Sequence, residues 1–250
     1  MNTLLIAGTD TKVGKTVVIM ALIAYWQRYC SSRRLGVMKP IDCPRDGYSA
    51  SGDSPSTDGA SIGRDSELLV RQFKLDQSAT EITPLMLSTL PAIATAKDGR
   101  QIELELVWQQ IQQLQQRDFV LLEALGGLGS PLTYETTMAD LAWDWHLPTV
   151  LVVPVQPGAV AHAVANVALA NQSKIHLKGI ILNAVQPCCA QDWENWAPID
   201  LIQSLTRKPV LGCMPHLADL ADLNKLAQVA AEWELERLLP GLEELLLQPS

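Results

Sequence analysis

The chain has 250 residues, of which 48% are hydrophobic and 18% charged, and its formal net charge is −8. This balance is typical of a folded globular protein that buries its own core, and it argues against a disordered or fibrous chain. Non-specific binding to nucleic acid needs a basic surface, so we expect no nucleic-acid partner. An acidic protein that binds phosphate must gather its positive charge locally, which directs attention to lysines beside glycines.

The N-terminal residues start with an apolar run, Met-Asn-Thr-Leu-Leu-Ile-Ala. The run has no basic segment and no small-residue cleavage site, and it is too short to cross a membrane. The cysteine spacing fits no zinc site. We therefore expect a cytoplasmic protein with free thiols and no membrane partner. The cysteines are Cys30, Cys43, Cys188, Cys189 and Cys213.

Short apolar runs alternate with helical patterns along the chain. Each run is apolar on both faces, as in a parallel sheet covered by helices. The alternation predicts one doubly wound α/β domain over residues 1–250, with a mostly parallel sheet and helices on both faces. The predicted strands are Thr3–Ala7, Leu35–Met38, Phe119–Glu123, Thr149–Val155, Gly179–Asn183 and Pro209–Cys213. The predicted helices are Lys15–Cys30, Ile102–Gln115, Ala161–Asn171 and Asp200–Leu205.

Two regions break the alternation. Asp42–Arg64 is rich in Ser, Gly, Pro and Asp, which predicts a long loop or a mobile lid. The segment Leu217–Leu247 is rich in Leu and Glu at helical spacing. It predicts one or two helices that cover the sheet or a partner.

A phosphate-binding loop is predicted at Gly8–Thr16, directly after a strand and before a helix. Its amides and the start of the helix would face phosphate oxygens, Lys15 would reach the β- and γ-phosphates, and the Thr16 hydroxyl would bind Mg²⁺. The usual spacing would put a glycine at position 9, which is Thr9 here, so a chance Gly-Lys-Thr is the alternative. The expected nucleotide-binding residues are Asp10, Thr11, Lys12, Val13, Gly14, Lys15, Thr16 and Val17.

The nine residues Gly-Thr-Asp-Thr-Lys-Val-Gly-Lys-Thr resemble the phosphate loop of dethiobiotin synthetases, and the resemblance extends from residue 1 to about Leu217. Related ATPases that partition DNA or place division sites usually carry an extra lysine at the position of Asp10, and Lys12 is offset from it. The resemblance implies a P-loop NTPase fold. It also implies a homodimer with the substrate site at its interface.

The implied reaction uses the small molecules 7,8-diaminononanoate, CO₂ and ATP. The diamine takes up CO₂ to form a carbamate, ATP phosphorylates the carbamate to a mixed anhydride, and the second amine closes a cyclic urea. ADP and phosphate are released, and Mg²⁺ is the cofactor. Because carbamate and γ-phosphate are both anions, cations must lie between them. The resemblance implies Lys15, Lys39 and Thr11 as the catalytic residues.

Lys39-Pro40 follows the second predicted strand, at the edge where ligands bind in an open α/β sheet. A lysine there is usually a solvated charge. The family binds its substrate with the lysine of a similar Lys-Pro stretch, which implies substrate binding by Lys39. A serine contact of the family corresponds to Cys43 here.

Two acidic residues are candidate Mg²⁺ ligands. Glu123 closes a predicted buried strand and precedes Gly126-Gly127, where the family has Glu-Gly-x-Gly-Gly and this chain has Glu-Ala-Leu-Gly-Gly. A polar strand cap followed by a turn is the alternative. Asp65 matches the family's metal-binding aspartate by position, with Asp58 and Glu67 as competitors and a helix N-cap as the structural alternative.

Four further positions are candidates for binding the adenine of ATP or the carboxylate of the second substrate. The resemblance implies that Asn183 reads adenine and that Pro215 lines the base pocket, although Asn183 also fits a turn. Gly158 and Ala159 open a helix whose amides, in the family, receive the substrate carboxylate from the neighbouring subunit. An ordinary strand-to-helix turn is the alternative there.

Two other functions remain open. A different ATP-dependent ligase, such as an amide synthase of the cobyrinic-acid type, shares the loop chemistry, but the chain shows no glutaminase domain with a Cys-His pair. A nucleotide-switched ATPase that binds a partner protein is the second alternative. The absence of the extra loop lysine and the presence of Lys39-Pro40 count against it.

Overall fold

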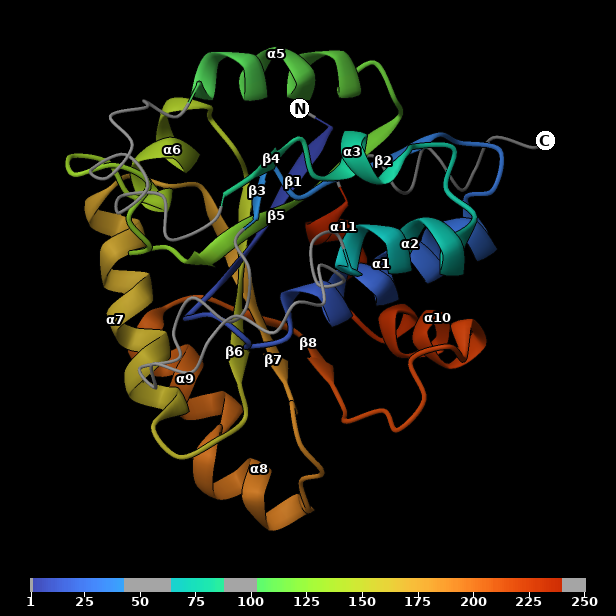
Figure 1. Cartoon of the computed structure of the whole chain (residues 1–250). Helices are drawn as coiled ribbons and strands as arrows, with labels where there is room; N and C mark the ends of the chain where they lie inside the picture. The colour runs from blue at the N-terminus through green and yellow to red at the C-terminus, as the bar shows by residue number, and fades with distance from the viewer. Residues whose placement is uncertain (1, 43–63, 88–102, 240–250) are drawn as a thin grey trace, which may run out of the picture.

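The computed structural model describes residues 2–42, 64–87 and 103–239. A six-stranded sheet lies at its centre with the strand order β2-β5-β1-β6-β7-β8 (Figure 1). All neighbouring strands in this sheet pair in parallel, and the chain changes direction across the sheet at β1. Ligands bind at such a switch point in open α/β sheets. The strands are β1 (Thr3–Gly8), β2 (Leu35–Met38), β5 (Phe119–Gly127), β6 (Thr149–Pro154), β7 (Leu177–Asn183) and β8 (Val210–Met214).

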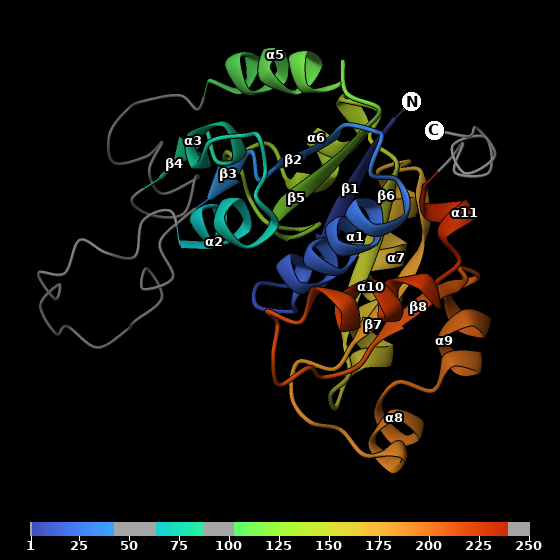
Figure 2. The same ribbon diagram turned by 90° about the vertical axis from the view of Figure 1, so that its right-hand side faces the viewer.

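Helices cover both faces of the sheet, which confirms the predicted doubly wound α/β class (Figure 2). One face packs against α1 (Lys15–Tyr29), α2 (Arg64–Phe73), α3 (Ala79–Ile82), α10 (Leu223–Ala231) and α11 (Leu235–Leu238). The other packs against α5 (Leu104–Leu114), α6 (Met138–Asp144), α7 (Ala159–Gln172), α8 (Ala190–Trp196) and α9 (Ile199–Thr206). Among the described residues, no helix is long and apolar enough to span a membrane.

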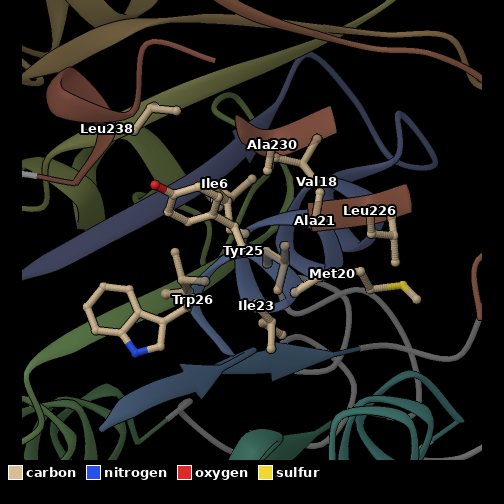
Figure 3. Packing of buried hydrophobic residues seen from close by; sticks show 14 of the residues in the cluster. Ile6, Val18, Met20, Ala21, Ile23, Tyr25, Trp26, Leu226, Ala230 and Leu238 are labelled. Atoms are coloured by element: carbon tan, nitrogen blue, oxygen red, sulfur yellow. The ribbon is translucent and has the colours of Figure 1, made fainter. Parts of the chain in front are cut away.

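The core on the α1 face explains why this helix is almost entirely apolar. Trp26 of α1 stacks on Phe119 of β5, with ring centroids 5.6 Å apart. Figure 3 shows Val18 and Ala21 of the same helix beside Leu226 and Ala230 of α10. Because α1 is buried between the sheet and α10, its N-terminus is held rigidly at the carboxyl edge of β1.

The predicted strands and helices are present, and β5 corrects one of them. The strand does not end at Glu123 but continues to Gly127, because Gly8 of β1 and Gly127 of β5 pair after a register shift. Glu123 is therefore an inward-facing residue of a long strand rather than a strand cap. The glycines after it belong to the sheet and not to a turn.

A small parallel pair, β3 (Ile41–Asp42) with β4 (Leu85–Met86), was not predicted from the sequence. Residues 43–63 lie outside the described residues, so the predicted loop or lid is described only at its two ends. Asp42 is a strand residue there, and Arg64 is the first residue of α2. In the C-terminal segment the helix begins at Leu223, where the Asp222 carboxylate accepts from the backbone N–H of Lys225 at 2.9 Å. Residues 217–222 are not helical, and residues 240–250 are outside the described part.

Candidate functional site

The loop between β1 and α1 has the backbone shape of a phosphate-binding loop. Gly14 caps the N-terminus of α1 with a φ of +88°, a left-handed conformation that glycine adopts without strain. A Cβ at this position would lie 2.0 Å from Asn183 Nδ2. The left-handed φ and the lack of space for a Cβ both require glycine here. The short distance to Asn183 also shows that the loop lies close to the end of β7.

The offset of the first glycine has a structural explanation. Thr9 occupies the usual glycine position, but its backbone N–H donates to the Val152 carbonyl at 3.0 Å, so it prolongs the pairing of β1 with β6. The tight approach occurs one residue earlier, where a Cβ on Gly8 would lie 2.6 Å from Val13 Cγ2 and 2.7 Å from the Asp10 carbonyl oxygen. The loop therefore begins its curl at Gly8.

Lys15 lies inside this curl. Its side chain is buried, with the residue 6% exposed, and Nζ donates to the Asp10 carbonyl oxygen at 3.1 Å. Burial lowers the pKa of Lys15, and the nearby carboxylate of Glu123 opposes that effect. Helix α1 thus presents a desolvated cation at its positive end, which is the electrostatic arrangement that attracts phosphate.

Glu123 lies beside the next residue of the helix. The Thr16 hydroxyl donates to Glu123 Oε1 at 3.1 Å, and Glu123 is only 5% exposed. Burial raises the pKa of this carboxyl group, while Lys39 and Lys15 oppose the increase. The strand pairing of β1 with β5 places Ile6 opposite Glu123, so the carboxylate lies under the loop that follows β1.

Lys39 connects three carboxylates. Its Nζ lies 2.9 Å from Asp42 Oδ1, 3.3 Å from Asp65 Oδ2 and 3.8 Å from Glu123 Oε1. Burial alone would lower the pKa of Lys39, but Glu123 and then Asp42 and Asp65 outweigh it, and the net shift is upward. The sequence predicted Lys39, Asp65 and Glu123 but missed Asp42. The available signal was a carboxylate three residues after a lysine at a strand end.

The donors expected to bind Mg²⁺ are chemically suitable. Thr16, Glu123 and Asp65 offer hydroxyl and carboxylate oxygens, which Mg²⁺ prefers, and Mg²⁺ usually needs only one or two carboxylates beside nucleotide phosphates. In residues 2–42, 64–87 and 103–239 no group of three His, Cys, Asp or Glu side chains is arranged to hold a metal ion. Asp65 lies inside the first turn of α2, not at an N-cap. Glu67 is exposed, and Asp58 lies outside the described residues.

The glycines of β5 bring a second backbone segment against the loop. Gly126 has a φ of +63°, and a Cβ there would lie 2.3 Å from Ser130 Oγ and 3.4 Å from Thr11 Cγ2. A Cβ on Gly127 would lie 2.8 Å from the Thr9 carbonyl oxygen. The two residues that depart from the family motif, Ala124 and Leu125, do not face the phosphate loop, because both pack in the core on the α7 face. The loop-facing glycines are thus retained.

The remaining predicted residues lie at the same edge of the sheet. Asn183 is 2% exposed and its Nδ2 donates to the Val13 carbonyl at 2.8 Å, so its described contact is with the phosphate loop. Pro215 is exposed directly after β8. Gly158, with a φ of +89°, caps α7, and Ala159 is its first residue. Three predicted residues remain. Lys12 is exposed in the loop and Val17 is in α1, whereas Cys43 is outside the described residues.

The fold and this loop define a P-loop nucleotide-binding protein, and residues 2–224 match a family model described as an AAA domain. The chain is similar to the ATP-dependent dethiobiotin synthetases of Gloeothece citriformis, with 50% identity over 96% of this chain and 100% of the relative, and of Crocosphaera subtropica, with 47% identity over 95% and 100%. The relative from Synechocystis shares 41% identity over 95% of this chain and 94% of its own. The chain belongs to the dethiobiotin synthetase family.

Similar solved structures have low sequence identity. A ParA family ATPase from Chlorobium tepidum has 17% identity and a TM-score of 0.48, with 95% of both chains covered. The MinD cell division protein of Aquifex aeolicus has 14% identity and a TM-score of 0.49, covering 98% of this chain and 94% of its own.

Proposed function

We propose that this chain is an ATP-dependent cyclo-ligase that converts 7,8-diaminononanoate, CO₂ and ATP into dethiobiotin, ADP and phosphate. The observation that carries the proposal is that the buried carboxylate of Glu123 lies near two lysines at the phosphate loop: the buried Lys15, whose charge acts on its pKa, and the partly buried Lys39, at 3.8 Å. Family membership supplies the substrate class. The same geometry suits the transfer of a phosphoryl group to a second anion.

In the proposed reaction one amine of the substrate attacks CO₂ and loses a proton, which gives a carbamate. A carbamate oxygen then attacks the γ-phosphorus of ATP, the bond from that phosphorus to the β–γ bridging oxygen breaks, and ADP leaves. The second amine attacks the carbonyl carbon of the mixed anhydride, phosphate departs with the oxygen it received, and a proton is released. The cyclic urea is then closed.

The chain's residues act by position and charge. Lys15 and the loop amides bind the β- and γ-phosphates, and Lys39 binds the carbamate, so the two anions approach with reduced repulsion. Thr11 lies against Gly126 and adds a hydroxyl beside the transferred group. Thr16, Glu123 and Asp65 would hold Mg²⁺, which supplies further charge neutralisation on the phosphates when bound.

The finer features of the family also belong to the proposal. The chain would act as one domain and as a cytoplasmic homodimer, with the backbone amides at the start of α7, at Gly158 and Ala159, holding the carboxylate of a substrate bound in the neighbouring subunit. Asn183 and Pro215 would line the adenine pocket, and Cys43 would contact the substrate. The structural support is that Asn183, Gly158 and the loop lie at one edge of the sheet.

Phosphate release from MgATP tests the proposal, measured with and without diaminononanoate plus bicarbonate. Release that requires both, together with dethiobiotin identified by mass spectrometry, is the expected result. Release that is indifferent to both would instead favour a nucleotide-switched ATPase. Release that requires a different amine or carboxylate would favour another ligase.

A further inference from the structure

Asp42 is the carboxylate closest to the Lys39 ammonium, and neither its spacing nor the family motif assigned it a role. The backbone on both sides of this ion pair is anchored. The Lys39 N–H donates to the Ile82 carbonyl at 2.7 Å, and the Asp42 carbonyl accepts from the Leu87 N–H at 2.9 Å. Asp42 also belongs to β3, which pairs with β4. Both residues of the ion pair therefore lie on backbone that is held in place by hydrogen bonds.

The distances show what this anchor does to the ammonium. Nζ lies 2.9 Å from Asp42 but 3.8 Å from Glu123 Oε1, the same oxygen that accepts the Thr16 hydroxyl at 3.1 Å. A lysine side chain has several rotatable bonds, so the position of its ammonium group depends on the groups that it contacts most closely. The ammonium therefore lies closer to Asp42, and to Asp65 at 3.3 Å, than to Glu123 Oε1, which accepts from Thr16.

We propose that Asp42 is a positioning residue that holds the Lys39 ammonium near Glu123 but out of hydrogen-bonding contact with its carboxylate. In that position Lys39 faces the edge of the sheet where the anionic substrate would bind, and Glu123 keeps its contact with α1. The side chains of the pair are 13% and 21% exposed, so solvent screens the interaction only in part. The catalytic consequence rests on the proposed function, whereas the effect on the position of Lys39 does not.

The first test is kinetic and compares Asp42→Asn with the wild-type protein. We expect kcat/KM for diaminononanoate to fall by about tenfold or more, since a partly buried ion pair is broken, while the KM for ATP stays within about twofold. Asp42→Glu, which keeps the charge, should recover most of the loss. Asp76→Asn is the matched control, because it breaks another carboxylate ion pair, with Arg117 at 2.6 Å, away from Lys39.

A double-mutant cycle separates positioning from a general charge effect. If Asp42 acts through Lys39, Asp42→Asn has no further effect on kcat/KM in a Lys39→Ala background. Losses that add in the double variant would overturn the proposal.

The last test does not need ligase activity. Trace acetylation with acetic anhydride, without nucleotide or substrate, is followed at Lys39 by peptide mass spectrometry. We expect Lys39 to be modified about threefold or more faster in Asp42→Asn than in Asp76→Asn, because its closest partner is gone. An unchanged rate in a variant with wild-type circular dichroism would overturn the proposal, even if the chain proved to have another activity.

Discussion

The side chain of Asn183 at the end of β7 donates a hydrogen bond to the backbone carbonyl of Val13, 2.8 Å away in the phosphate loop. The two residues are 170 positions apart in the chain, and Asn183 is almost completely buried. Gly14 packs directly against the same amide. A single side chain thus fixes the shape of the loop from the neighbouring part of the sheet.

Asn183→Ala should therefore weaken ATP binding as well as the fold. The Val13 carbonyl loses a buried donor, which costs about 1–3 kcal/mol of unfolding free energy. We expect a clear rise in the Kd for MgATP in titration calorimetry. Gln203→Ala is the control, since Gln203 Oε1 accepts from the Val210 N–H at 2.9 Å in the sheet away from the loop. It should lower stability without changing the Kd, and equal effects of both variants on the Kd would contradict the bracing role of Asn183.

Gly14→Ala is expected to prevent ATP binding. A left-handed φ costs an alanine about 1–2 kcal/mol, and the added Cβ would collide with the Asn183 amide. Gly129→Ala is the control, because the nearest atom to a Cβ there is Leu169 Cδ2 at 3.6 Å. Its stability should stay within about 0.5 kcal/mol of the wild type. Tight ATP binding by Gly14→Ala, measured in the same calorimeter, would show that the loop adapts to the extra methyl group.

The order of the six strands of the central sheet and of helices α1, α5, α7 and α9 was predictable because each of these elements carries its own apolar pattern. Contacts that depend on tertiary pairing were not. Asp42 reaches Lys39 because β3 and β4 hold the segment in place, and β4 is too short to give a pattern of its own. The contact of Asn183 with Val13 joins residues 170 positions apart, so the sequence suggested only that Asn183 lies at a strand end. The extension of β5 to Gly127 could not be predicted either, because it depends on β1 lying beside β5.

Lys15→Ala and Lys39→Ala should each slow turnover with the fold retained. Removing one charged group that stabilises a transition state costs about 2.7–4 kcal/mol, or about 10²–10³ in kcat. The rate of dethiobiotin formation is measured in samples quenched at successive times, and far-ultraviolet circular dichroism checks the fold. Lys225→Ala on the exposed face of α10 is the control and should keep the wild-type rate. Near-normal turnover in either site variant would remove that lysine from the mechanism.

The raised pKa of Glu123 predicts an unusual dependence of stability on pH. Its carboxyl group binds a proton more tightly in the folded than in the unfolded state, because burial outweighs the attraction of Lys39 and Lys15. Between the unfolded value of about 4.5 and the raised folded value, the folded state carries more protons, so stability falls as the pH rises. Without metal or nucleotide, Glu123→Gln removes this cost. The variant should be more stable than the wild type at neutral pH, and the difference should shrink as the pH approaches 4.5.

Urea denaturation between pH 4.5 and 8 in the presence of a chelator measures this difference. Asp76→Asn provides a control of opposite sign. The hydrogen bond from Arg117 lowers the pKa of Asp76, so its contribution to stability is present above the unfolded value of 3.8 and is lost as the pH falls through the depressed folded value. That variant should be less stable than the wild type at neutral pH. If Glu123→Gln were also less stable there, the attraction of Glu123 to Lys39 and Lys15 would outweigh the cost of its burial, and the carboxylate would be a net stabilising part of the site.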